Sequence, residues 1–142
     1  RRVSSVSVRL KRDSANTGDS PLTVQLETSD GEVIASGAIP AAVFPVGAGD
    51  SGRDNHNGWG HATFDQPVTL ASGQTYHLVL SAPSDTIFRA LSIRKGVGYE
   101  FHANTWFPDG YAQYDPGSGW VGFAQPGGVA HSRQADLQFY FQ

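Results

Sequence analysis

The residues best suited to bind a ligand lie between positions 96 and 123, a stretch that holds half of the chain's aromatic side chains. They are Tyr99, Phe101, Trp106, Phe107, Tyr111, Tyr114, Trp120 and Phe123. An aromatic face can stack on the apolar C–H face of a sugar ring while neighbouring polar groups form hydrogen bonds with its hydroxyls. These residue types favour carbohydrate binding. The alternative is that the rings are buried, because aromatic residues also build strands and cores.

A hairpin predicted in this stretch would arrange some of the rings. Residues 115–119 are typical of a short connection between two strands, and closing the chain there pairs Tyr114 with Trp120 and Ala112 with Gly122. A pair of large rings beside small side chains would form a flat shelf for a sugar. The predicted stacking residues are Trp120, Tyr114, Trp106 and Trp59, and the predicted polar partners are Asp109, Gln113, Asp115 and Gln125.

Residues 47–60 form a Gly-rich stretch without apolar periodicity, and a loop of that length in a compact domain is usually functional or mobile. Its Asp and Asn side chains supply the oxygen ligands that Ca²⁺ prefers, so we predict a structural calcium site at Asp50, Asp54 and Asn57. The alternative is that Gly, Asn and Asp only build turns here. The 5 histidines lack the spacing of a zinc motif, so we expect no transition-metal site.

Few residues could carry out catalysis. The chain has no Cys, which excludes a thiolate nucleophile, a disulfide and Cys-ligated zinc. Ser118 lies in the predicted hairpin connection rather than in the strand-to-helix elbow of a serine hydrolase. Glu100, Asp109 and Asp115 could converge as a carboxylate pair, but nothing in the sequence requires it. The last enzymatic alternative is a small polysaccharide lyase or hydrolase that uses His102 or His131 with Tyr99 or Tyr111 as acid and base.

The elements that must position these residues are strands. Apolar residues alternate with polar ones over short runs separated by Gly, Pro, Asn and Asp, and no window keeps a helical spacing for three turns. The predicted strands are residues 6–10, 22–28, 33–39, 62–64, 68–70, 76–80, 90–93, 111–114, 120–123 and 137–141. We therefore expect an all-β fold, an antiparallel β-sandwich or jelly roll of about 8–10 strands, in a single domain of residues 1–142.

One hairpin has a register that the sequence predicts in detail. The dipeptide Asp30-Gly31 favours the positive φ angles of a tight turn. The pairs predicted from a turn at this point are Ser29 with Glu32, Thr28 with Val33, Leu26 with Ala35, Val24 with Gly37 and Leu22 with Ile39. The apolar residues of both strands then share one face, as a sheet with one buried face requires.

The charge pattern argues against two kinds of partner. The chain has a net charge of −3 and no apolar run long enough to span a membrane. Half of its basic residues lie in the first twelve positions: Arg1, Arg2, Arg9, Lys11 and Arg12. Apolar residues alternate with them, which is typical of a solvated strand face. Because the overall balance is acidic, we expect no nucleic-acid partner.

Residues 64–80 carry the pattern Phe-x-x-Pro-Val-x-Leu-x-x-Gly-x-x-Tyr-x-Leu, in which Gly73 supplies a turn. The core stripe predicted from this pattern is Leu70, Tyr76, Leu78 and Leu80. With residues 110–120, which end in Gly-Ser-Gly-Trp, and residues 136–139, this segment resembles the β-jelly-roll accessory domains of secreted bacterial proteins. The resemblance covers about half of the chain and speaks for fold more than for function.

The resemblance implies a carbohydrate-binding-module-like or spacer domain attached to a secreted carbohydrate-active enzyme or surface protein. We therefore expect a secreted, noncatalytic module that binds a polysaccharide or oligosaccharide and is tethered to other domains of a longer polypeptide. The alternative is a structural or protein-interaction spacer whose aromatic residues are all buried. If the first interpretation holds, Trp120→Ala abolishes binding without unfolding the chain.

Overall fold

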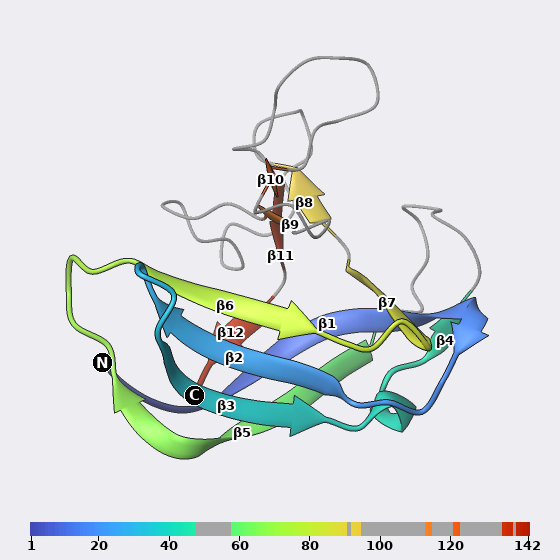
Figure 1. Ribbon diagram of the computed structural model, residues 1–142, viewed down its shortest axis with the longest axis horizontal. Helices are drawn as coiled ribbons and strands as arrows, with labels where there is room; N and C mark the ends of the chain where they lie inside the picture. The colour runs from blue at the N-terminus through green and yellow to red at the C-terminus, as the bar shows by residue number, and fades with distance from the viewer. Residues whose placement is uncertain (48–57, 91, 95–112, 115–120, 123–134, 138) are drawn as a thin grey trace. The chain divides into compact units, whose positions relative to one another are not determined.

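A computed structural model describes residues 1–47, 58–90, 92–94, 113–114, 121–122, 135–137 and 139–142. The chain divides into two compact units, one made of Arg1–Ala90 with Phe139–Gln142 and the other of Leu91–Gln138. Strands form nearly all the regular structure of the described residues, and the one helix among them is the short 3₁₀ helix η1, Ala41–Val43 (Figure 1). The predicted all-β class is confirmed.

The strands differ greatly in length. The larger unit contains β1 (Arg2–Thr17), β2 (Leu22–Thr28), β3 (Val33–Ile39), β4 (Val46–Gly47), β5 (Gly58–Thr69), β6 (Tyr76–Ser81), β7 (Thr86–Ala90) and β12 (Phe139–Phe141). The described part of the smaller unit contains β8 (Ser92–Arg94), β9 (Gln113–Tyr114), β10 (Val121–Gly122) and β11 (Ala135–Leu137). β8 pairs with β11 and β9 with β10, both antiparallel. The described residues thus form more strands than predicted, because half of the strands are pieces of two or three residues.

β1 is the centre of a five-stranded sheet, since it pairs with each of the other four strands. Val6 pairs both with Phe141 of β12 and with Ala62 of β5, so β12 and β5 lie on opposite edges of β1. Further along, Arg12 lies between β7 and β4 in the same way. All these pairings are antiparallel except that of β1 with β4. β1 therefore fixes the relative positions of four strands.

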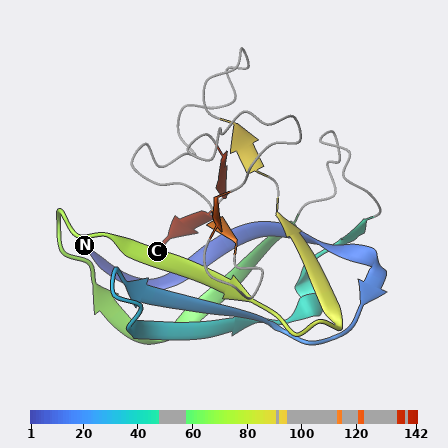
Figure 2. The same ribbon diagram turned by 45° about the horizontal axis from the view of Figure 1, so that its top comes forward.

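A second sheet has three antiparallel strands in the order β3-β2-β6, and β2 runs between the other two in both views (Figures 1 and 2). The buried apolar residues of the two sheets and η1 form the core: Val3, Val6, Val8, Leu10, Leu22, Val24, Leu26, Ala35, Ile39, Ala41, Phe44, Ala62 and Phe64. The two sheets enclose this core as a β-sandwich, as predicted. The jelly-roll topology and the single-domain organisation stay predictions.

Small residues let the two sheets approach each other. A Cβ atom added to Gly60 of β5 would overlap with the ring of Phe44 and come within 2.9 Å of Ile39 Cγ2. A Cβ atom on Gly37 of β3 would lie 2.7 Å from the carbonyl oxygen of Thr63. Because the atoms around Gly60 belong to buried side chains, they cannot move aside into solvent.

We expect Gly60→Ala to lower the free energy of unfolding by about 1–3 kcal/mol, because the added methyl group overpacks the core. Urea denaturation measures this change. Thr63→Ala, at an exposed position of the same strand, is the matched control and should change stability by about 0.5 kcal/mol or less. Replacing Phe44 by Leu in the Gly60→Ala background should restore part of the loss. An unchanged denaturation midpoint for Gly60→Ala would contradict the packing described here.

The predicted register of the β2–β3 hairpin is confirmed away from the turn. The confirmed pairs are Leu22 with Ile39, Val24 with Gly37 and Leu26 with Ala35. The register shifts between Leu26 and Glu27, where Glu27 pairs with Val33. Ile34 is therefore an extra residue on β3, a β-bulge.

The turn itself is one residue longer than predicted. The Gly31 amide donates to the Thr28 carbonyl (3.0 Å), and the Thr28 amide donates to the Glu32 carbonyl (2.9 Å). Gly31 has a φ of 84°, as expected for the last residue of a three-residue hairpin loop. The predicted pairs Ser29 with Glu32 and Thr28 with Val33 are therefore wrong. The longer turn and the β-bulge each shift the register by one residue, and the two shifts cancel.

Gly73 supplies the turn between β5 and β6, as predicted, with a φ of 77°. The Ala71 amide donates to the hydroxyl of Tyr76 at 3.0 Å, which gives the Gly-x-x-Tyr pattern a physical basis. The core stripe Leu70, Tyr76, Leu78 and Leu80 is half-buried rather than buried. β6 is an edge strand of its sheet, so neighbouring strands cover its side chains from one side only.

The prediction of a solvated basic face on β1 is also corrected. Arg1 and Arg2 are exposed, but Arg9 and Arg12 are half-buried and Lys11 is only 5% exposed. β1 is the central strand of its sheet, so neighbours on both edges crowd its side chains. The alternation of the sequence indicated the strand but not its central position.

Asp65 links β5 to the edge of the other sheet. Its carboxylate accepts hydrogen bonds from the Ser36 amide (3.0 Å), the Ser36 hydroxyl (3.1 Å) and the Gln66 amide (2.9 Å). The Gln66 side chain donates to the Ile34 carbonyl at 3.1 Å. At this point the ladder between β5 and β1 is interrupted. Ser5 pairs with Thr63, and the next pair along the ladder is Val3 with Val68. Asp65 and Gln66 thus bind backbone groups of β3 at the point where the β1–β5 ladder is interrupted.

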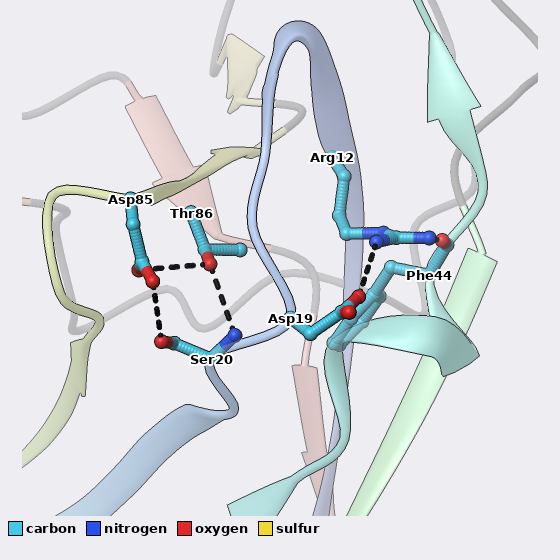
Figure 3. A network of polar contacts seen from close by, with 6 residues as sticks. All are labelled: Arg12, Asp19, Ser20, Phe44, Asp85 and Thr86. Atoms are coloured by element: carbon cyan, nitrogen blue, oxygen red, sulfur yellow. Dashed lines mark hydrogen bonds and ion pairs between the residues drawn. The ribbon is translucent and has the colours of Figure 1, made fainter.

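The loop after β1 is tied to the turn before β7 (Figure 3). The Ser20 hydroxyl donates to the Asp85 carboxylate (2.9 Å), and the Ser20 amide donates to the Thr86 hydroxyl (3.2 Å). The Gly18 amide donates to the Asp85 carbonyl (2.8 Å). These bonds hold together two segments that are distant in the sequence.

Arg12 connects β1 to the segment that follows β3. Its Nε donates to the Phe44 carbonyl at 3.2 Å (Figure 3). Its contact with Asp19, at 3.9 Å, contributes little because the Asp19 side chain is 99% exposed and solvent screens the pair.

The Asp65 contacts predict a pH dependence of stability. The Ser36 amide and hydroxyl bonds, and then the Gln66 amide bond, lower the pKa of Asp65 below its ordinary value of 3.8. A carboxyl whose pKa is lowered by folding stabilises the fold above its unfolded-state pKa, and this contribution disappears as the pH falls through the folded-state pKa. We expect Asp65→Asn to lower the melting temperature at pH 7, with the difference from wild type vanishing below pH 3.8. Asp30→Asn, at an exposed turn position, is the control. A difference that stays constant down to pH 2 would contradict this assignment.

Candidate functional site

The five-stranded sheet carries an exposed pair of aromatic side chains. Trp59 of β5 is 46% exposed and Tyr140 of β12 is 43% exposed. Their ring centroids lie 5.1 Å apart and the ring planes form an angle of 61°, an edge-to-face contact. We call these two residues, together with Ser7 and His61 beside them, the aromatic site.

Strand periodicity places the aromatic site on the face opposite to the core. Along β5, Trp59 and His61 are exposed, while Gly60 and Ala62 between and after them are buried. On β12, Tyr140 pairs with Ser7, whereas its neighbours Phe139 and Phe141 pair with the core residues Val8 and Val6. Because successive side chains of a strand point to opposite faces, the four residues of the site share the outer face.

The two rings meet across β1. β5 and β12 lie on opposite edges of β1, and Ser7 pairs with His61 on one edge and with Tyr140 on the other. The Ser7 side chain lies between these larger neighbours and is only 3% exposed. A small residue at this position leaves space for Trp59 and Tyr140 to come into contact.

The His61 ring is held by Ser7. Ser7 Oγ and His61 Nδ1 are 3.2 Å apart, so the hydroxyl fixes the orientation of the imidazole. A serine next to a histidine is also the start of a hydrolytic site. Here, however, the Ser7 hydroxyl is buried and closed to a substrate. The bond therefore orients His61, whose exposed ring can form a hydrogen bond with a ligand lying beside Trp59.

Of the residues predicted to bind a ligand, the structure shows the side chain of Trp59. It lies on a strand paired with Arg9, not in the loop predicted for residues 47–60, and it is exposed. Gln113 and Tyr114 are located on β9. The other predicted residues lie outside the described residues: Trp106, Asp109, Asp115, Trp120 and Gln125, and the proposed calcium ligands Asp50, Asp54 and Asn57. The described residues contain no group of three or more His, Asp or Glu that could hold a metal ion.

The predicted register of the aromatic hairpin is wrong by one residue. Tyr114 pairs with Val121 and Gln113 pairs with Gly122. The predicted pairs of Tyr114 with Trp120 and of Gln113 with Val121 are therefore wrong. Trp120 and the side chains of Gln113 and Tyr114 lie outside what the structure describes, so the shelf stays a prediction. The exposed aromatic pair of the described residues is Trp59 with Tyr140.

Sequence reasoning missed three residues of the aromatic site: Tyr140, Ser7 and His61. A signal for Tyr140 was present, because alternation in residues 139–141 puts the middle ring opposite to its two neighbours. Phe139 and Phe141 are in register with the core residues Val8 and Val6. Nothing local indicated that Ser7 and His61 would lie beside the two rings, since that depends on strands distant in the sequence.

Comparison of the chain with protein-family models, curated proteins and solved structures gives no match. Within the described ranges, no helix is long and apolar enough to cross a membrane. The interpretation of the aromatic site therefore depends on its geometry alone.

The exposure of Trp59 predicts that its ring contributes little to folding. We expect Trp59→Ala to lower the free energy of unfolding by about 1 kcal/mol or less, the value of one edge-to-face ring contact. Phe44→Ala, a matched aromatic truncation at a 1% exposed position, should cost about 3–5 kcal/mol. Urea denaturation of both variants tests this difference. Equal losses would show that Trp59 belongs to the core and would remove it from the site.

Proposed function

We propose that the chain is a noncatalytic carbohydrate-binding module that recognises a polysaccharide through exposed aromatic side chains. The observation that carries the proposal is the contact between Trp59 and Tyr140, two rings about half exposed on the outer face of the five-stranded sheet. Large exposed rings in contact are rare on a surface that needs only to be solvated, and they mark binding sites. His61, exposed and oriented by Ser7, provides a polar group beside them.

Binding at such a surface is weak for each sugar unit. A shallow face covers few ligand atoms, so the affinity for a short oligosaccharide is low. A polymer offers many copies of its repeating unit, and tethering to other domains adds further contacts, so apparent affinity increases through multivalency. We accordingly propose that the module is secreted and tethers a longer polypeptide to a polysaccharide. A calcium ion held by Asp50, Asp54 and Asn57 is part of the proposal as a structural element.

The test is an array of plant, algal and microbial polysaccharides probed with the whole chain, once with Ca²⁺ and once with a chelator. Release of soluble sugar is measured in the same wells. We expect binding without release of product. Trp59→Ala and Tyr140→Ala should each weaken binding to the best polymer about two- to tenfold, since an aromatic contact contributes about 0.5–1.5 kcal/mol.

Ile87→Ala is the matched control, because Ile87 is a large apolar residue that is 42% exposed, comparable to Trp59. It should leave binding unchanged. Trp120→Ala, tested in parallel, shows whether the aromatic residues between positions 96 and 123 contribute as the sequence predicts. Absence of binding to every polysaccharide of the array would overturn the proposal in favour of a structural spacer. Release of soluble sugar would overturn the noncatalytic part of the proposal.

A further inference from the structure

The Ser7 hydroxyl is buried against the imidazole of His61. The Ser7 side chain is 3% exposed, and among the described residues the hydroxyl has a single hydrogen-bond partner, His61 Nδ1, at 3.2 Å. A hydroxyl has one hydrogen that it can donate and two lone pairs that can accept. The bond to His61 therefore uses either the hydroxyl hydrogen or one of the lone pairs, and the other groups of this hydroxyl are left over.

The two tautomers of a neutral imidazole form this bond in opposite directions. If Nδ1 carries the proton, it donates to the hydroxyl oxygen, and the buried hydroxyl hydrogen has no acceptor within the described part of the chain. If Nε2 carries the proton, Nδ1 accepts the hydroxyl hydrogen, and only lone pairs are left over. A buried donor without a partner is costlier than an oxygen with a spare lone pair. The surroundings of Ser7 thus favour the tautomer with the proton on Nε2.

The second ring nitrogen of His61 is available to a ligand. The two nitrogens of an imidazole form hydrogen bonds in widely divergent directions, so Nε2 is directed away from Ser7 when Nδ1 is directed toward it. The His61 side chain is exposed and lies two residues after Trp59, on the same face of β5. No residue that the structure describes forms a hydrogen bond with Nε2. An N–H donor therefore lies beside the Trp59 ring.

We propose, on the basis of the carbohydrate-binding function proposed above, that Ser7 is a positioning residue that keeps His61 as a hydrogen-bond donor, so that the site recognises a sugar by an acceptor oxygen. This oxygen is a ring, glycosidic or hydroxyl oxygen, or the carbonyl oxygen of an acetamido group. A sugar that stacks on Trp59 keeps its oxygens at its rim, where a neighbouring donor can reach them. An imidazole free to change its tautomer could pair with a donor or an acceptor, whereas the tautomer fixed by Ser7 pairs with an acceptor only.

The first measurement needs no ligand. NMR of the whole chain with ¹⁵N-labelled histidine, at about pH 8 where an imidazole is ordinarily neutral, distinguishes the tautomers by the ¹⁵N shifts of the two ring nitrogens. We expect the His61 proton on Nε2 in the wild type and a shift toward a mixture of both tautomers in Ser7→Ala. The matched control is Ser5→Ala, since Ser5 is a serine of β1 that is 6% exposed and donates to Gln142 Oε1 (3.5 Å) instead. It should leave the His61 signals unchanged.

The second measurement is binding of cellohexaose, xylohexaose, mannohexaose and N-acetylchitohexaose, together with the polysaccharides of the array. His61→Ala should weaken binding about two- to tenfold, the contribution of one hydrogen bond. Ser7→Ala should weaken binding by no more than this factor, and it should have no further effect when His61 is already Ala. A serine that only stabilised the fold would have the same effect in both backgrounds. The wild-type NMR spectrum tests the tautomer even if Ser7→Ala fails to fold.

The outcomes separate this inference from the proposed function. A proton on Nδ1 in the wild type, or an unchanged tautomer in Ser7→Ala, overturns the positioning role of Ser7. Binding that depends on Trp59 but is unaffected by His61→Ala overturns the donor role of His61 and leaves the carbohydrate-binding function in place. Absence of binding to the four hexamers and to the array overturns the proposed function and the donor role together.

Discussion

The structure depends on β1, which pairs with β5 and β4 along one edge and with β12 and β7 along the other. Because it is central, its inner side chains Val6, Val8 and Leu10 are almost fully buried and anchor the core. The same centrality acts on the outer face, where it brings β5 and β12 close enough for their rings to touch across β1. The core and the candidate site are therefore two faces of one hydrogen-bonding arrangement, and a change in the register of β1 would affect both.

Small residues make this arrangement possible on both faces. On the inner face, Gly60 accepts the Phe44 ring and lets the two sheets close. On the outer face, the small side chain of Ser7 lies between His61 and Tyr140 and leaves room for the aromatic contact. In each case a large ring is accommodated because a neighbouring position is small. This requirement couples positions on different strands, so neither can be understood from its own strand alone.

The features that were predicted correctly depend on residues close together in the sequence, whereas features that depend on distant residues were not predicted. The all-β class and the inner register of the β2–β3 hairpin follow from alternation, which is a local property. The errors concern single residues that alternation does not specify: the extra residue of the turn at Gly31, the β-bulge at Ile34 and the one-residue shift of Tyr114 against Val121. The contact between Trp59 and Tyr140 could not be predicted, because the two residues lie on strands far apart in the sequence that are brought together by β1.

The alternation of β1 also decides on which face each of its basic residues lies. Alternation along β1 places Arg9 on the side of Trp59, and the same alternation keeps the apolar residues inside. Arg12 has the same parity as the core residues Val8 and Leu10, and its Nε hydrogen bond to the Phe44 carbonyl offsets part of the cost of a cation on that side. The pattern that folds the sandwich therefore places Arg9 on the face of the rings, whereas a cation of the opposite parity needs a polar partner within the fold.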